Sequence, residues 1–176
     1  MKKIIFPIAI VATLMLSAFT TIKSTAWKIN DGYAIKFTSE NPTGIFRTMT
    51  GDIQFDENDL AASSFNMTVD VASINTGNGM QNKHAKSAKW FDAEQYPKIT
   101  FRSTKIEKTG SGYQTVGLLN LHGIEKEISI PFTFSDDTFL GSFEVDRLDY
   151  KIGDMKGMNA NASQKLRVDI SVPVSK

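Results

Sequence analysis

An alternation of apolar and polar residues runs through most of this chain and constrains its fold more than any other feature. In the segment 128–134, isoleucine and phenylalanine alternate with serine, proline and threonine. Successive side chains of a β-strand point to opposite faces, so this pattern predicts strands with one apolar and one polar face. The same pattern, separated by short turns, recurs in the segments 33–38, 52–56, 65–72, 99–101, 113–121, 139–145 and 166–174. The sequence therefore predicts an all-β protein of about eight strands.

The edges of such a sheet decide its overall form. An open sheet leaves edge strands that pair with neighbouring molecules, whereas closure into a barrel removes both edges. About eight strands enclose an interior that side chains fill or that holds one small ligand. The short turns indicate an antiparallel meander, and we expect it to close into a barrel. The alternation alone leaves open whether the apolar lumen is packed or holds a ligand.

Residues 78–89 interrupt the alternation between the third and fourth predicted strands. The segment is polar, carries Ala85 and Ala88, and has no glycine after Gly79. We expect one short helix here. It leads into Trp90 and Phe91, which either gate or floor the barrel or fasten the helix to it. Met155–Ala162 is expected to be a loop, and neither a repeat nor a linker indicates a second domain.

The first residues resemble an export signal. Lys2 and Lys3 precede an apolar run from Ile4 to Phe19, and the small residues of Ser24-Thr25-Ala26 suit a cleavage site. We expect a signal peptide at 1–26 and one domain at 27–176, located in the periplasm or secreted. A retained membrane anchor is the alternative, because the run is close to the roughly 20 residues that span a bilayer.

Composition excludes several classes of protein. There are no cysteines, so neither disulfides nor a lipid-modified cysteine can form. Removal of Lys2, Lys3 and Lys23 with the signal changes the formal net charge from +1 to −2. Such a balance gives no electrostatic footprint for nucleic acid.

Three lysines form one local exception to this balance. Lys83, Lys86 and Lys89 are spaced at three residues, which places them in one basic stripe. The stripe is either a solvated face or a contact for anionic headgroups. A transient contact with a membrane surface therefore remains an expectation.

Catalytic and metal-binding patterns are weak. His84 and His122 are the only two histidines, and no H-E-x-x-H motif is present. His84 with Ser87 and Asp92 resembles a triad only by composition, because no nucleophile elbow accompanies it. We therefore expect no catalytic residues, no metal and no enzyme activity, with a hydrolase as a minor alternative.

Four motifs in order resemble one known family. They are D-V-A-S-I-N-T-G (Asp70–Gly77), the K-H-x-x-S-x-x-W-F-D run (Lys83–Asp92), Y-P-K-I-T-F-R-S-T (Tyr96–Thr104) and L-L-N-L-H-G-I-E-K-E-I (Leu118–Ile128). Their combination is similar to the YceI-like family of exported bacterial proteins. The resemblance implies an eight-stranded antiparallel, lipocalin-like barrel with one helix beside it. It also implies a polyisoprenoid or other lipid-like ligand inside the lumen and, for many members, a periplasmic location.

The chain departs from the family pattern near its start. Tyr33-Ala34 stands where members commonly show a His-Ser pair, and Asn82-Lys83 replaces the usual Arg-Asp ahead of the helix histidine. The characteristic Arg-x-Asp is kept as Arg147-Leu148-Asp149. These differences leave the predicted fold unchanged and concern the polar end of the ligand.

A long isoprenoid offers only apolar surface, so its site needs a dry lining and no catalytic group. At about 0.8 kcal/mol per buried CH₂, each five-carbon unit contributes on the order of 4 kcal/mol, against an association cost of roughly 4–15 kcal/mol. Phenylalanine and methionine suit such a lining. The candidate lining residues are Phe37, Phe55, Phe65, Met67, Val69, Phe91, Ile99, Phe101, Leu119, Leu121, Phe132, Phe134, Phe143 and Val145.

The sequence therefore predicts an exported carrier or reservoir that binds an isoprenoid, an isoprenoid quinone or another fatty amphiphile. The ligand is expected to be non-covalent, with no covalent cofactor. The alternative is a ligand-free envelope barrel that acts through a protein partner. Met80, Met155 and Met158 lie in glycine-containing segments and are either an adaptable mouth or ordinary loop residues. The pattern assigns no oligomeric state.

Overall fold

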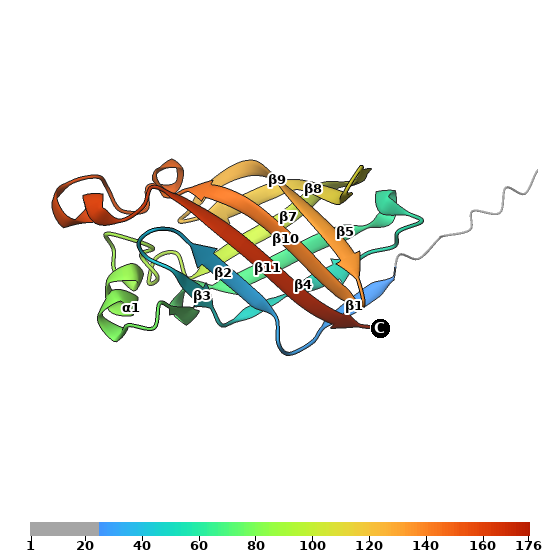
Figure 1. Ribbon diagram of the computed structural model, residues 1–176, viewed down its shortest axis with the longest axis horizontal. Helices are drawn as coiled ribbons and strands as arrows, with labels where there is room; N and C mark the ends of the chain where they lie inside the picture. The colour runs from blue at the N-terminus through green and yellow to red at the C-terminus, as the bar shows by residue number, and fades with distance from the viewer. Residues whose placement is uncertain (1–24) are drawn as a thin grey trace, which may run out of the picture.

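The computed structural model describes residues 25–176, which form a β-barrel with a small helical end (Figure 1). The strands are β1 (Ala26–Ile29), β2 (Ala34–Thr38), β3 (Gly44–Phe46), β4 (Met49–Gln54), β5 (Ser64–Asp70), β6 (Ile74–Asn75), β7 (Lys98–Thr109), β8 (Gly112–Leu121), β9 (Ile124–Ser135), β10 (Thr138–Asp146) and β11 (Lys165–Ser175). The helix α1 spans Gly79–Lys86, and short 3₁₀ turns cover Leu60–Ala62, Val71–Ser73, Arg147–Tyr150 and Gly157–Asn161.

These segments form eight strands of a closed barrel, because the first three strands are each interrupted once. β1 pairs with β4 and β11 near one end, while β2 pairs with β3 and β11 further along, so β1 and β2 occupy one strand position. β3 and β4 share the next position, and β5 and β6 the third. Every pairing is antiparallel, and the last strand pairs with the first. The predicted eight-stranded antiparallel barrel is confirmed.

Side-chain hydrogen bonds stabilise the interruption between β3 and β4. The hydroxyl of Ser73 accepts from the backbone N–H groups of Arg47 and Thr48, each at 3.1 Å. The hydroxyl of Tyr33 accepts from the N–H of Met49 at 3.0 Å and donates to the carbonyl of Arg47 at 3.1 Å. The backbone groups that leave the ladder here are thus satisfied by side chains.

The helix lies between the third and fourth strand positions, as the sequence predicts, but it is shorter than the expected 78–89. The side chain of Asn78 caps it by accepting from the N–H groups of Met80 and Gln81. Ser87 then turns to an extended conformation and ends the helix. Trp90 and Phe91 follow in a turn and pack partly buried against the barrel core.

One end of the barrel is closed by a cluster of rings that we call the aromatic plug: Phe55, Phe65, Tyr113, Phe132, Phe134 and Phe139. Phe55 is 1% exposed and packs edge-to-face against four of the other rings at centroid distances of 5.2–5.8 Å. Trp27 packs edge-to-face against Phe134 and donates its indole N–H to the carbonyl of Phe55. Such pairs add about 0.5–1.5 kcal/mol each beyond their buried area.

The opposite end carries α1, the loop 39–43 and a segment at 151–163 that we call the capping segment (Figure 1). The expected loop at 155–162 lies in this segment and contains one 3₁₀ turn. Among residues 25–176, no helix combines the length and apolar character needed to cross a membrane. The expected signal peptide at 1–26 lies outside the described residues except for Thr25 and Ala26, and Ala26 begins β1.

The aromatic plug contains one titratable pair with a measurable consequence. Tyr113 donates its hydroxyl to the carboxylate of Glu57, and this hydrogen bond together with burial raises the pKa of Tyr113 to about 12. An unfolded tyrosine titrates near 10. The folded state therefore holds this proton more tightly. The resulting stability is fully present below about pH 10 and is lost as the pH rises towards 12.

We predict that Tyr113→Phe lowers the free energy of unfolding by about 2 kcal/mol at pH 8, and by much less near pH 12. Urea unfolding of both proteins across this pH range measures the difference. A difference that stays constant with pH would contradict the assignment.

Candidate ligand-binding cavity

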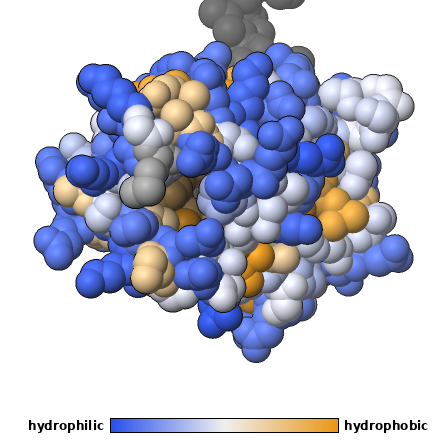
Figure 2. All heavy atoms as spheres, turned by 60° about the vertical axis from the view of Figure 1, so that its left-hand side comes forward, coloured by the Kyte–Doolittle hydropathy of each residue, from blue (hydrophilic) through white to orange (hydrophobic). Residues whose placement is uncertain are grey.

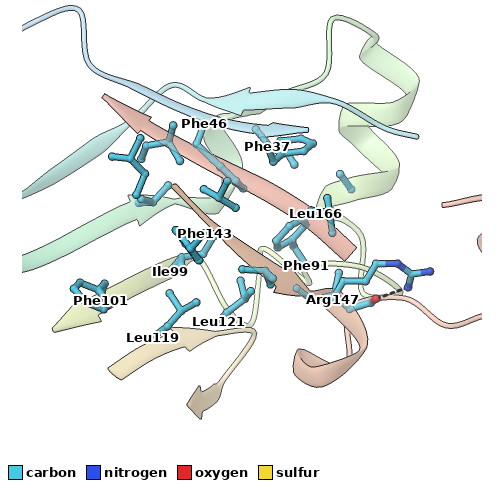
Figure 3. A pocket seen from close by; sticks show the side chains of 18 of the residues that line it. Phe37, Phe46, Phe91, Ile99, Phe101, Leu119, Leu121, Phe143, Arg147 and Leu166 are labelled. Carbon is cyan, nitrogen blue, oxygen red and sulfur yellow. Dashed lines mark hydrogen bonds between the residues drawn. The ribbon is translucent and has the colours of Figure 1, made fainter. Parts of the chain in front are cut away.

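A cavity of about 660 Å³ runs from the aromatic plug to the end that carries α1. All eight strand positions contribute side chains to it, and most of these side chains are apolar. In Figure 3, residues from several strands, among them Phe37, Ile99 and Leu166, point into the common space. Figure 2 views the α1 end and shows a hollow with apolar residues inside it.

Twelve of the fourteen lining residues expected from the sequence lie on the cavity wall: Phe37, Phe65, Met67, Val69, Phe91, Ile99, Phe101, Leu119, Leu121, Phe132, Phe143 and Val145. Phe55 and Phe134 lie instead in the aromatic plug, where edge-to-face and tilted packing against neighbouring rings removes them from the wall. Contact of the twelve with a ligand stays a prediction.

The wall also contains apolar residues that the sequence analysis did not select: Ile35, Phe46, Met49, Ile53, Ile74, Ile130, Phe139, Ile152, Leu166, Val168, Ile170 and Val172. Most of them belong to strands that were recognised. Ile35 is in phase with Phe37 on β2, and the residues from Leu166 to Val172 share one phase of β11. The period-two signal identifies the members that lie on predicted strands, whereas Phe46, Ile74 and Ile152 lie outside the predicted strands and carry no such signal.

Four glycines occupy inward positions of the wall. Gly51 lies in phase with Met49 and Ile53, and Gly117 with Thr115 and Leu119, which all line the cavity. Gly44 is likewise in phase with Phe46 on β3, and Gly141 itself lines the cavity on β10.

Large side chains from neighbouring strands lie over three of these glycines. A Cβ on Gly117 would stand 2.6 Å from the ring of Phe101, and one on Gly44 would stand 2.4 Å from the ring of Phe37. A Cβ on Gly51 would stand 2.7 Å from the sulfur of Met67. These distances are too short for a real Cβ contact. The glycines therefore let long side chains lie along the wall, which keeps them out of the centre of the lumen.

The polar residues of the cavity gather at its mouth. They are Asn41, Thr76, Gln81, His84, Asn159, Asn161 and Ser163, whereas Thr115 is a polar residue on the barrel wall. Several of them bond within the protein: Asn41 donates to the carbonyl of Asn161, and Thr76 donates to the side chain of Asn82. Among residues 25–176, Gln81 and His84 form hydrogen bonds through their backbone groups and none through their side chains. These two side chains lie three residues apart on α1, on the face that lines the cavity.

Arg147 holds the capping segment against the barrel. Its side chain is 4% exposed, and its guanidinium donates to the carbonyls of Ile152, Asp154, Asn159, Ala162 and Ser163 at 2.8–3.3 Å. It also lies over the ring of Trp90 at 5.1 Å. Figure 3 shows one of its hydrogen bonds at the margin of the cavity.

Burial lowers the pKa of the Arg147 guanidinium, and the nearby carboxylates of Asp146 and Asp154 oppose this shift. No carboxylate lies within ion-pair distance of Arg147 in the described part of the chain. Five backbone carbonyls therefore stabilise the buried charge, and the charge in turn orders the segment that supplies them.

The two histidines lie in unrelated places. His122 follows β8 in a left-handed turn, its Nδ1 lies 2.9 Å from the carbonyl oxygen of Tyr150, and its ring packs edge-to-face on Tyr96. Ser87 donates its hydroxyl to the backbone carbonyl of His84 and not to the imidazole. Within residues 25–176, no cluster of three or more His, Cys, Asp or Glu side chains is suited to a metal ion.

The chain is similar in sequence to a known protein family. A YceI-like domain model matches residues 20–174. A UPF0312 protein of Vibrio campbellii is 33% identical over 137 residues, which cover 72% of this chain and 72% of that protein. Protein YceI of Escherichia coli O157:H7 is 31% identical over 136 residues, which cover 73% of this chain and 71% of that protein. A UPF0312 protein of Vibrio parahaemolyticus is 40% identical over 92 residues, a match that spans 49% of its length.

Solved structures share the barrel. BcnA of Burkholderia cenocepacia superimposes with a TM-score of 0.77 at 26% identity, covering 85% of this chain and 100% of that chain. A polyisoprenoid binding domain from Saccharophagus degradans superimposes with a TM-score of 0.55 at 14% identity, covering 88% of this chain and 95% of that chain. At this identity the second similarity concerns the fold alone.

We predict that replacing the inward glycines lowers the free energy of unfolding to different extents. In Gly117→Ala, the new methyl meets the carbonyl of Arg102 at 2.5 Å and the ring of Phe101, so the strand or the ring must move. In Gly141→Ala, the shortest contact is 3.3 Å. We expect Gly117→Ala to cost about 1–3 kcal/mol and Gly141→Ala to cost less, as measured by urea unfolding. Equal losses in the two variants would contradict the packing described.

A second prediction concerns the hydrogen bonds by which Arg147 orders the capping segment. Arg147→Met keeps the length of the side chain but leaves five carbonyls without their donor, so we expect a loss of about 1–3 kcal/mol. Hydrogen exchange should accelerate selectively in residues 151–163. The control is Arg102→Met, at an exposed position on β7. Unchanged exchange in the capping segment of Arg147→Met would show that the guanidinium does not order it.

Proposed function

The chain belongs to the YceI-like domain family, and from this premise we propose that it is an exported binding protein for one long apolar ligand. The ligand class is a polyisoprenoid, an isoprenoid quinone or another lipid. The protein encloses the chain of this ligand in its barrel and serves as a carrier or reservoir.

The open apolar lumen is the observation that carries this proposal. A cavity of about 660 Å³ falls within the range of small-molecule sites, roughly 300–1,000 Å³. An interior packed by its own side chains would instead favour a barrel that acts through a protein partner. The polyisoprenoid binding domain of Saccharophagus degradans has the same fold, so this fold accommodates a ligand of that class in another protein.

The polarity of the cavity orients the ligand. Its floor is formed by phenylalanines of the aromatic plug, including Phe65 and Phe132, while the polar residues lie at the mouth. The apolar tail therefore lies towards the plug and the polar head lies between α1 and the capping segment. Gln81 and His84 are the side chains best placed to bind this head, because their polar groups are not engaged within the described residues.

The proposed head is uncharged, such as a hydroxyl, an amide or a quinone carbonyl. The charged side chain on the cavity wall is Arg147, and its guanidinium already donates to five carbonyls. A diphosphate head would meet no lysine among the lining residues.

The proposal includes export of the protein and a binding function without catalysis. Lys2 and Lys3, the apolar run to Phe19 and the small residues before Trp27 support a signal peptide and a periplasmic or secreted location. The binding function needs no enzyme activity and no covalent cofactor, because burial of an apolar chain supplies the free energy.

We predict that protein purified from its native host without detergent carries a non-covalent lipid. Native mass spectrometry should show an added mass of several hundred daltons or more, and solvent extraction should release the compound for identification. Bare polypeptide that also takes up neither quinone nor prenyl lipid on titration would refute the proposal.

A pair of variants locates the ligand in the lumen. Gly141→Leu places an isobutyl group in the cavity, because Gly141 lines the wall. Leu140→Gln changes the adjacent residue, which is 48% exposed on the outside of the same strand. We expect Gly141→Leu to reduce lipid uptake at least tenfold and Leu140→Gln to leave it unchanged. Equal uptake by both variants would place the ligand elsewhere.

A further inference from the structure

We propose that the α1 end of the barrel docks onto an anionic phospholipid bilayer through Lys83, Lys86 and Lys89 together with Met80 and Met155. This inference rests on the proposed function, because it describes where a lipid cargo enters and leaves. The occupant of this surface is the bilayer itself.

The lysines give the surface its charge. Lys83 and Lys86 lie on α1, and Lys89 follows in the turn after it. No acidic residue occurs in residues 76–91, so these charges are not balanced locally along the chain. The four ion pairs between described residues involve other lysines and arginines. Each lysine close to an anionic bilayer contributes about 1 kcal/mol of attraction.

The acidic groups at this end are largely engaged with other partners. Asp149 pairs with Lys126 at 3.1 Å. Asp154 accepts from Asn159 and from the N–H of Lys156; these bonds, with smaller contributions from Lys156 and Lys89, lower its pKa. Asp146 accepts from the N–H of Leu148 and from the side-chain amide of Gln164. Glu40, Asp92 and Glu94 are further acidic residues in the segments at this end, and Lys151 and Lys156 add two exposed bases. The lysines of α1 and of the turn after it therefore form the side of the mouth suited to an anionic surface.

Exposed apolar side chains accompany these charges. Met80 is 73% exposed although it also lines the cavity, and Met155 on the capping segment is 48% exposed. They are two of the four most exposed large apolar residues of the described chain, together with Ile45 and Leu140. Unbranched methionine adapts to irregular apolar surroundings such as acyl chains. Basic and apolar residues side by side are typical of surfaces that bind at the membrane interface.

The position of the mouth favours a bilayer as the partner. The aromatic plug closes the other end, so a long apolar ligand enters the lumen at the α1 end. Such a chain is poorly soluble in water, and direct contact between the mouth and a bilayer avoids its exposure. Met80 extends from the cavity wall to the outer surface and provides apolar contact along this route.

Vesicle flotation tests the proposal on the full mature protein. The vesicles contain phosphatidylcholine alone or phosphatidylcholine with a quarter phosphatidylglycerol, at low and high salt. We expect binding to the anionic vesicles at low salt, with loss at high salt and little binding to the neutral vesicles. The triple variant Lys83→Gln, Lys86→Gln, Lys89→Gln should weaken partitioning by about 100-fold, at roughly fivefold per lysine.

The matched control carries the same change of charge at the plug end. Lys28, Lys105 and Lys108 are exposed there, Lys105 in an exposed ion pair with Glu107, and the control replaces all three with glutamine. We expect this variant to bind anionic vesicles like the unmodified protein. Met80→Ser should weaken binding about tenfold with the lysines intact.

Three results would overturn the docking surface: equal binding to neutral and anionic vesicles, equal loss in the two triple variants, or no vesicle binding at all. Native mass spectrometry on the same samples separates this outcome from failure of the proposed function. If the protein carries lipid but does not bind anionic vesicles, the docking surface is refuted and the carrier function is not. An empty protein that takes up no lipid would refute the carrier function.

Discussion

The contact between large side chains and inward glycines is the interaction on which the open lumen depends. An eight-stranded barrel is narrow enough for its own side chains to fill it. Here the rings of Phe37 and Phe101 lie over Gly44 and Gly117, and the thioether of Met67 lies over Gly51. The wall is therefore apolar and aromatic, yet the space along the barrel axis stays free. Burial of a ligand chain can then supply the contacts that side chains would otherwise have made to each other.

The two ends of the barrel give this space a direction. At one end, Phe55 packs against aromatic rings from four other strands, and the resulting aromatic plug closes the lumen. At the other end, the guanidinium of Arg147 donates hydrogen bonds to backbone carbonyls of the capping segment, which lies opposite the short helix α1. The polar residues lie at this second end, so the cavity itself is amphiphilic. A ligand with a long apolar tail and a small polar head matches both ends.

The fold could be predicted from the sequence because its two signals are local. The period-two alternation predicts one segment at each of the eight strand positions but not the short strands β1, β3 and β6, and the break at 78–89 places the helix between the third and fourth positions. The lining was predicted less completely. Phe55 and Phe134 have the same pattern as lining residues, and only the three-dimensional packing of rings assigns them to the plug. The alternation of each strand predicts that these glycines point inward. It does not predict which side chains lie over them, because those side chains come from neighbouring strands. The role of Arg147 depends on carbonyls up to sixteen residues away, which no local pattern shows.

The central claim is that side chains on the wall leave an apolar lumen that a lipid fills. A crystal structure of the protein purified without detergent tests it most directly. The account predicts elongated density along the barrel axis, from the ring of Phe139 to the space between His84 and the capping segment, with the ring of Phe101 over Gly117. An axis crossed by Phe37 and Phe101, with no density between them and no space for a hydrocarbon chain, would contradict it.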